Sequence, residues 1–174
     1  MRWCLNSRWR SSRSSISRRP IFTHVYQPAD CLQKTFEAAE RARFPLHHLM
    51  FEVTENEPAR DIGHLQIIFT EYKRHGMITA IDDFGAGHSG LNMLADFQPD
   101  VLKIDMVLTR AINSDAVRYE IARAIIGPCR SLHISVIAEG VETIQEALTL
   151  RELGVRLFQG VRAAGMFYAI YTRC

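Results

Sequence analysis

Five short apolar segments alternate with helical patterns along most of this 174-residue chain, and this alternation constrains the fold more than any other feature. The segments are residues 49–55, 77–84, 101–105, 133–141 and 156–160. Each of them is apolar on both faces, which is typical of strands in a parallel sheet that helices cover on its outer side. The repeated order of strand and helix therefore predicts an α/β fold with a parallel sheet.

Helical patterns fill the intervals between these segments. Residues 28–43 predict the first helix, and an apolar stripe over residues 62–72 predicts the second. We expect a further helix to begin at a Ser114 cap. Thr143 and Glu146 have the spacing of a capping box, so the last predicted helix begins there.

The two ends differ in composition from the middle. Residues 1–20 hold six arginines, six serines and no acidic residue, which predicts a disordered basic arm. Such a segment is also compatible with a nucleic-acid-binding arm or an organelle transit peptide. We expect residues 21–160 to form the folded domain and residues 161–174 to be a divergent tail.

Apolar content is sufficient for a core, at 47% hydrophobic residues, but no apolar run is long enough to predict a membrane span. The basic start lacks the hydrophobic stretch of a secretory signal, so a cytoplasmic location is expected. The four cysteines are scattered without the spacing of a zinc site, and we expect them to be reduced.

Charged or polar side chains end every predicted strand. They are Glu52, Glu55, Asp82, Asp83, Lys103, Asp105, Glu139, Glu142 and Gln159. In a (β/α) barrel, the C-terminal ends of the strands face a common mouth where the chemistry takes place. Carboxylates without cysteine or a suitably placed histidine favour Mg²⁺ or Mn²⁺ over zinc. The sequence therefore predicts a divalent-cation site at one end of the sheet.

The glycines after the second predicted strand raise an alternative, because residues 85–90 spell the G-x-G-x-x-G of a dinucleotide-binding turn. A pyrophosphate bound at such a turn is an anion. Asp82 and Asp83 directly precede the turn and would repel that anion, whereas they would attract a cation. A nucleotide oxidoreductase is thus the weaker hypothesis.

Five motifs also carry a family resemblance. FEVTE, IDDFGAGHSGL, LKID, VIAEGVET and LFQG, in this order and spacing, resemble the EAL domain of bacterial cyclic-di-GMP phosphodiesterases. The resemblance implies a partial (β/α)₈ TIM-type barrel with parallel strands. It also implies Mg²⁺- or Mn²⁺-dependent hydrolysis of cyclic-di-GMP to pGpG by two-metal catalysis, in bacterial second-messenger signalling.

By this resemblance, Glu52, Asp82 and Asp83 are metal ligands, and Asp82 bridges the two ions. Lys103 would orient the attacking water and offset developing charge. Glu139 would help to hold the metal and water network. The individual role of each residue follows from the family motifs, whereas the adjacent charges of Asp82 and Asp83 favour a cation on their own.

The resemblance also gives roles around the loop that follows Asp83. Glu55, placed with the catalytic residues, would steady this loop, and Gln159 would join the substrate or water network. The loop itself would be regulatory and would form dimer contacts, through Phe84, Gly85, Gly87, Ser89 and Leu91. The expected partners are cyclic-di-GMP and a second copy of the chain, with neither a membrane nor a nucleic acid.

The sequence departs from the family near both ends. We expect the tripeptide Glu-Ala-Leu of the family's first strand to be absent from the chain, and the segment before residue 25 holds no asparagine ligand. We therefore expect a truncated or frame-shifted product with weak or no activity. The alternatives are an inactive relative that binds nucleotide or a protein partner, and a remnant without a stable fold. Residues 49–55 and 156–160 would be unpaired edge strands, which predicts oligomers or aggregation.

Overall fold

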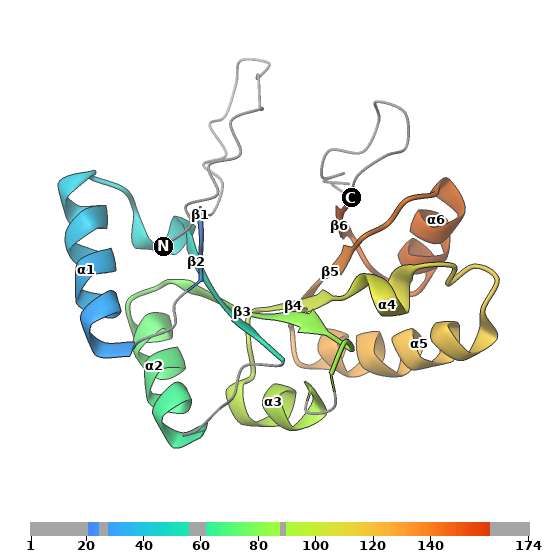
Figure 1. The fold of residues 1–174 in the computed structure, drawn as a ribbon, viewed down its shortest axis with the longest axis horizontal. Coiled ribbons are helices and arrows are strands. Elements are labelled where there is room, and N and C mark those ends of the chain that lie inside the picture. The colour runs from blue at the N-terminus through green and yellow to red at the C-terminus, as the bar shows by residue number, and fades with distance from the viewer. Residues whose placement is uncertain (1–20, 25–27, 56–61, 88–89, 161–174) are drawn as a thin grey trace, which may run out of the picture. The chain divides into compact units, whose positions relative to one another are not determined.

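The computed structural model describes residues 21–24, 28–55, 62–87 and 90–160, and strands alternate with helices throughout them (Figure 1). These residues belong to two compact units. The first lies within residues 1–53 and 59–79, and the second within residues 54–58 and 80–174. The expected arm at residues 1–20 and tail at residues 161–174 lie outside the described residues.

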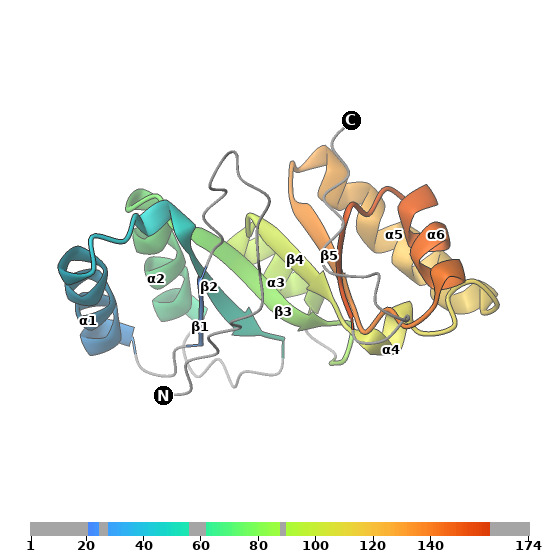
Figure 2. The same ribbon diagram turned by 90° about the horizontal axis from the view of Figure 1, so that it is seen from above.

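The first unit pairs two parallel strands with two helices. It holds β1 (Ile21–His24), α1 (Pro28–Arg41), the 3-10 helix η1 (Leu46–His48), α2 (Ile62–Arg74) and all but the last residue of β2 (Leu49–Thr54). Phe51 of β2 stacks on Tyr72 of α2 with ring centroids 4.3 Å apart, and Phe69 meets Phe51 edge-on at 5.7 Å. These rings fix α2 against β2, and Figure 2 shows α1 beside α2.

The second unit continues the alternation with four parallel strands. It holds most of β3 (Ile78–Phe84), then α3 (Gly90–Phe97), β4 (Val101–Ile104), α4 (Met106–Thr109), α5 (Ala116–Ser131), β5 (Ser135–Glu139), α6 (Ile144–Glu152) and β6 (Leu157–Gln159). β4 pairs in parallel with β3 and β5, and β5 pairs in parallel with β6. The C-terminal ends of these strands therefore lie at one edge, as a site of barrel type requires.

The strand between residues 21 and 24 changes one expectation. β1 pairs in parallel with β2, so that Ile21 lies opposite Leu49 and His24 opposite Glu52. The prediction that residues 49–55 form an unpaired edge is therefore wrong. A four-residue strand beside a basic segment has too little periodicity to be recognised in the sequence.

The helix starts were predicted with mixed success. The capping box is confirmed, because Thr143 Oγ1 accepts from the Glu146 amide at 3.2 Å and Glu146 Oε2 accepts from the Thr143 amide at 2.9 Å. The Ser114 cap is wrong. Asp115 caps α5, and its carboxylate accepts from the amides of Val117 and Arg118. A carboxylate in the next position reaches both amides, while the Ser114 hydroxyl donates to the Ala111 carbonyl.

The predicted α/β class with parallel strands is confirmed by these pairings. Among the helices that the structure describes, none combines the length and the apolar character needed to cross a bilayer.

Candidate metal centre

A β-bulge in β3 brings two adjacent carboxylates to the same place. Ile81 pairs with Leu102 and Phe84 with Ile104, so β3 holds one more residue than β4 between these pairs. Adjacent residues of a regular strand point to opposite faces, but the extra residue of a bulge breaks this alternation. Within the bulge, Asp83 has a φ of 54°, which is a left-handed backbone conformation that few residues other than glycine adopt. The Asp83 amide donates to Asp82 Oδ1 at 2.9 Å.

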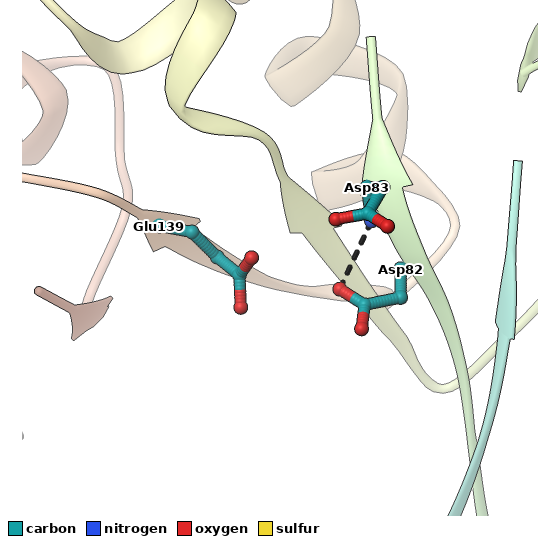
Figure 3. A group of neighbouring side chains, drawn as sticks. All are labelled: Asp82, Asp83 and Glu139. Atoms are coloured by element: carbon teal, nitrogen blue, oxygen red, sulfur yellow. Dashed lines mark hydrogen bonds between the residues drawn. The ribbon is translucent and has the colours of Figure 1, made fainter. Parts of the chain in front are cut away.

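The third carboxylate comes from β5. Figure 3 shows the Glu139 side chain reaching from β5 towards Asp82 and Asp83 of β3. One carboxylate oxygen from each of the three residues lies within 4.8 Å of the others, and all three side chains are partly buried. This set is the carboxylate cluster. Asp82 and Asp83 are adjacent in one sequence motif, whereas Glu139 belongs to another motif 56 residues later, and the fold brings the three carboxylates together.

Lys103 of β4 lies against the carboxylate cluster. Its Nζ is 2.7 Å from Asp82 Oδ1 and 2.8 Å from Glu139 Oε1, and its side chain is only 6% exposed. A buried ammonium is costly without partners, and these two carboxylates compensate it. Lys103 thus lies beside acids of both neighbouring strands, and its expected role in orienting water and offsetting charge stays a prediction.

Burial shifts the titration of one cluster member. Desolvation raises the pKa of the Glu139 carboxyl above its ordinary value. The Lys103 ammonium opposes this shift, while the charges of Asp82 and Asp83 add to it. Like charges this close favour the neutral acid unless a cation is present. The carboxylate cluster is thus a site whose excess negative charge would be relieved by a divalent cation.

Glu55 holds the loop that follows the aspartates. Its Oε2 accepts from the amides of Gly85 at 2.8 Å and Gly87 at 3.1 Å, and its Oε1 accepts from the amide of Gly90 at 2.7 Å. The Glu55 side chain is buried, at 5% exposure. Glycine amides that converge on one carboxylate form an anion-binding nest, here filled by the chain itself. The amides of the G-x-G-x-x-G turn therefore bind the Glu55 carboxylate of the same chain and not a pyrophosphate. This removes the observation on which the dinucleotide-binding hypothesis rested.

The other predicted site residues lie as follows. Glu52 of β2 is buried in the first unit and lies opposite His24. Gln159 is exposed and lies opposite Glu139 in the register of β6 with β5. Of the loop residues, Phe84 is buried, Leu91 is 70% exposed, and Ser89 lies outside the described residues. The roles of Glu52 and Gln159 stay predictions.

The expected absence of the tripeptide Glu-Ala-Leu is wrong, because it occurs at residues 146–148, although these residues lie in α6 and not in a strand. Glu146 serves the capping box and also accepts from the amides of Ala111 at 2.7 Å and Glu142 at 2.9 Å. It is only 4% exposed. This buried contact to Ala111 was not foreseen, because a capping box in the sequence reveals only the partner within its own helix.

The donor set of the carboxylate cluster fits a hard divalent cation. It offers carboxylate oxygens alone, from two strands, at a separation that one ion can span. Mg²⁺ and Mn²⁺ both prefer such oxygen ligands. The residues present therefore agree with the cation predicted from the sequence.

Comparisons with known proteins agree with this geometry. The EAL domain model matches residues 8–164 of the chain. PdeD of Escherichia coli (strain K12), a probable cyclic di-GMP phosphodiesterase, is 42% identical over 116 residues, which are 67% of this chain and 21% of PdeD. The chain thus spans about a fifth of the length of that relative.

Solved structures resemble the chain over most of its length. A standalone versatile EAL protein from Vibrio cholerae O395, in its c-di-GMP bound form, is 43% identical with a TM-score of 0.75, covering 81% of this chain and 62% of that one. BlrP1 of Klebsiella pneumoniae, in a manganese/cy-diGMP complex, is 33% identical with a TM-score of 0.77, covering 83% of this chain and 38% of that one. The chain therefore has the TIM-barrel-like fold of these proteins.

Proposed function

We propose, from the premise that this chain belongs to the EAL domain family, that it binds cyclic-di-GMP at the carboxylate cluster and hydrolyses it to linear pGpG. The observation that carries this proposal is the convergence of Asp82, Asp83 and Glu139 beside the buried Lys103. Relatives named for this activity, and solved relatives bound to this nucleotide, support the choice of substrate.

The proposed cofactor is Mg²⁺ or Mn²⁺. Asp82, Asp83 and Glu139 would hold it through carboxylate oxygens. A bound divalent cation would supply Lewis-acid chemistry, which lowers the pKa of water and offsets charge on a phosphoryl oxygen. We propose a pair of cations, with Asp82 contributing to both, because paired cations suit in-line displacement at phosphorus.

The remaining residues act through charge and position. Lys103 carries a fixed positive charge between Asp82 and Glu139, where it offsets negative charge that develops on a phosphate. Glu55 keeps the loop after Asp83 closed by accepting its amides, which holds Asp83 in its unusual conformation. Neither residue needs to change its protonation state in this scheme.

The test is a hydrolysis assay on the full chain. Cyclic-di-GMP is incubated with the protein and Mn²⁺, and pGpG is separated by chromatography. The proposal expects product formation that chelation abolishes and that Asp82→Asn abolishes. Asp96→Asn is the matched control, because Asp96 is an exposed residue of α3.

Nucleotide binding distinguishes the alternative. If calorimetry shows that the chain binds cyclic-di-GMP while no pGpG forms above the Asp82→Asn level, the inactive relative is the better description. If the folded chain neither binds nor hydrolyses cyclic-di-GMP in the presence of Mn²⁺ or Mg²⁺, both functions are wrong.

Self-association is part of the same proposal. Leu91 is 70% exposed at the end of the loop that Glu55 holds. A large apolar side chain on a fixed loop suits contact with a second copy. Light scattering after size-exclusion chromatography should give twice the chain mass, and Leu91→Asp should give the monomer.

A further inference from the structure

The short helix α4 lies against both loops that follow the strands carrying the carboxylate cluster. A Cβ placed on Gly85, which follows Asp82 and Asp83, would lie 2.3 Å from Leu108 Cδ1. A Cβ placed on Gly140, which follows Glu139, would lie 2.4 Å from Met106 Cβ. Both loops therefore approach α4 so closely that an added Cβ would force atoms of α4 to shift. Figure 1 shows α4 at the end of β4.

One side chain of α4 reaches the backbone of the cluster itself. Thr109 Oγ1 donates to the carbonyl oxygen of Glu139 at 2.5 Å, across 30 residues of sequence. Thr109 is 0% exposed, so water does not compete for this carbonyl from the side of the hydroxyl. A buried hydroxyl group needs a hydrogen-bond acceptor, and the acceptor of Thr109 is the backbone carbonyl of Glu139, a residue of the carboxylate cluster.

The contact lies where strand pairing stops. The register of β4 with β5 ends at Ile104 opposite Ala138, one residue before Glu139. On the other side, Glu139 pairs with Gln159 of β6. On the side of β4, the Glu139 carbonyl therefore accepts from the Thr109 hydroxyl instead of from a strand amide. This hydrogen bond fixes the backbone from which the Glu139 side chain extends.

The opposite loop is fixed to the same segment. The Asp105 amide donates to the Phe84 carbonyl at 3.0 Å, and the Asp105 carboxylate caps α4 through the Val107 amide at 2.7 Å. The segment from Asp105 to Thr109 therefore binds the backbone after the aspartates at one end and the backbone of Glu139 at the other. The segment therefore contacts both sides of the cluster, in addition to the pairing of β4 with β3 and β5.

We infer that Thr109 is a positioning residue, whose buried hydroxyl holds Glu139 at ligand distance from Asp82 and Asp83. The inference rests on the cation site of the proposed function and extends it to a residue that touches neither cation nor substrate. Residues that orient a ligand typically change metal affinity by about 10-fold or more when they are replaced.

The experiment measures Mn²⁺ affinity of the full chain by the paramagnetic resonance signal of free Mn²⁺. Thr109→Val keeps the shape and removes the hydroxyl, whereas Thr109→Ser keeps the hydroxyl. We expect Thr109→Val to weaken Mn²⁺ binding by about 10-fold and Thr109→Ser to stay within about 2-fold of the unchanged protein. Rescue by serine separates the hydroxyl from the methyl group of the side chain.

Thr79→Val is the matched control, because Thr79 is equally buried, at 0% exposure, in β3. It should lower the unfolding temperature and leave Mn²⁺ affinity unchanged. Equal loss of affinity in Thr79→Val and Thr109→Val would overturn the inference, since general destabilisation would then explain both.

A readout without metal completes the test. Hydrogen exchange of amides 139–142 in the cation-free protein should be faster in Thr109→Val than in Thr109→Ser. If the unchanged protein binds Mn²⁺ and Thr109→Val binds it equally well, the inference is wrong and the proposed function stands. If the unchanged protein binds no Mn²⁺, the proposed cation site is wrong and the inference falls with it.

Discussion

The ammonium of Lys103 lies 2.7 Å from Oδ1 of Asp82, in a part of the second unit where both side chains are largely buried. The same ammonium is 2.8 Å from Glu139, so one positive charge compensates two carboxylates. Removing it would leave the carboxylate cluster with uncompensated negative charge. The cost of that change depends on whether a cation is present.

Lys103→Met should therefore destabilise the cation-free chain by about 3 kcal/mol, as expected when one partner of a buried ion pair is lost. Mn²⁺ should raise the unfolding temperature of this variant more than that of the unchanged protein. Thermal unfolding with and without Mn²⁺ measures both effects. Lys34→Met, at an exposed lysine of α1, is the control and should change neither. Equal stability of Lys103→Met and the unchanged protein would contradict the charge argument.

Glu55→Ala should loosen the loop after Asp83, because three backbone amides lose their buried acceptor. We expect a loss of about 2 kcal/mol or more in the free energy of unfolding. Hydrogen exchange of the amides of Gly85, Gly87 and Gly90 should quicken even under conditions where the rest of the second unit stays protected. Glu120→Ala removes an exposed partner of Arg123 and should have little effect. An unchanged exchange rate at these amides would show that the loop is held in another way.

Gly85→Ala should cost more stability than Gly76→Ala. Both glycines have positive φ, of 97° and 75°, so alanine is strained at each. An added Cβ meets Leu108 at position 85 and nothing within 4 Å at position 76. Urea denaturation should give a loss of about 1 kcal/mol for Gly76→Ala and about 2–3 kcal/mol for Gly85→Ala. The reverse order would mean that α4 does not press on this loop.

The acid sensitivity of folding should depend on Glu146. Burial alone would raise the pKa of its carboxyl, but the amides of Ala111, Glu142 and Thr143 donate to it and bring the pKa below its ordinary value. The stabilisation is complete above the pKa of the unfolded chain, about 4.3, and is lost as the pH falls through the lower folded pKa.

The substitution Glu146→Gln tests whether the pKa of the Glu146 carboxyl is lowered in the folded protein. The difference in unfolding free energy between the unchanged protein and the variant should be constant from about pH 7 to pH 5 and should shrink below about pH 4. Urea denaturation at a series of pH values measures it. Glu152→Gln, at an exposed position of α6, should show no such change. A difference that grows on acidification would be incompatible with a lowered pKa.

Cys129 should resist alkylation in the folded chain. It is 0% exposed, and burial raises the pKa of its thiol to about 11. The thiolate that reacts with iodoacetamide is therefore scarce at pH 8. Peptide mapping after brief labelling should show Cys129 unmodified, and labelling in urea should modify it fully. Rapid labelling under native conditions would show that the Cys129 side chain of α5 is not buried in the protein core.

Much of the fold was determined by the sequence alone. The apolar runs around Phe51, Ile81, Leu102 and Ala138 are long enough to predict buried parallel strands, and these residues are indeed inside. Thr143 and Glu146 predicted a helix start, because the two hydrogen bonds of a capping box join residues only three positions apart. The polar residues at the strand ends predicted a candidate site at one edge of the sheet, since parallel strands end at one edge, and the roles of these residues stay predictions.

Other features were decided only by tertiary structure, because they depend on contacts between distant segments. Asp82 and Asp83 read as an alternating pair in the sequence, and only the bulge against β4 turns both towards Glu139. The glycines at 85, 87 and 90 spell a phosphate-binding turn, yet their amides are taken by Glu55, 30 or more residues earlier. Thr109 carries no motif at all, and its place beside Glu139 exists only because β4 and β5 are neighbours. Local patterns record local hydrogen bonds and hydrophobic burial, whereas the partner of a buried polar group is chosen by the packing of the whole unit.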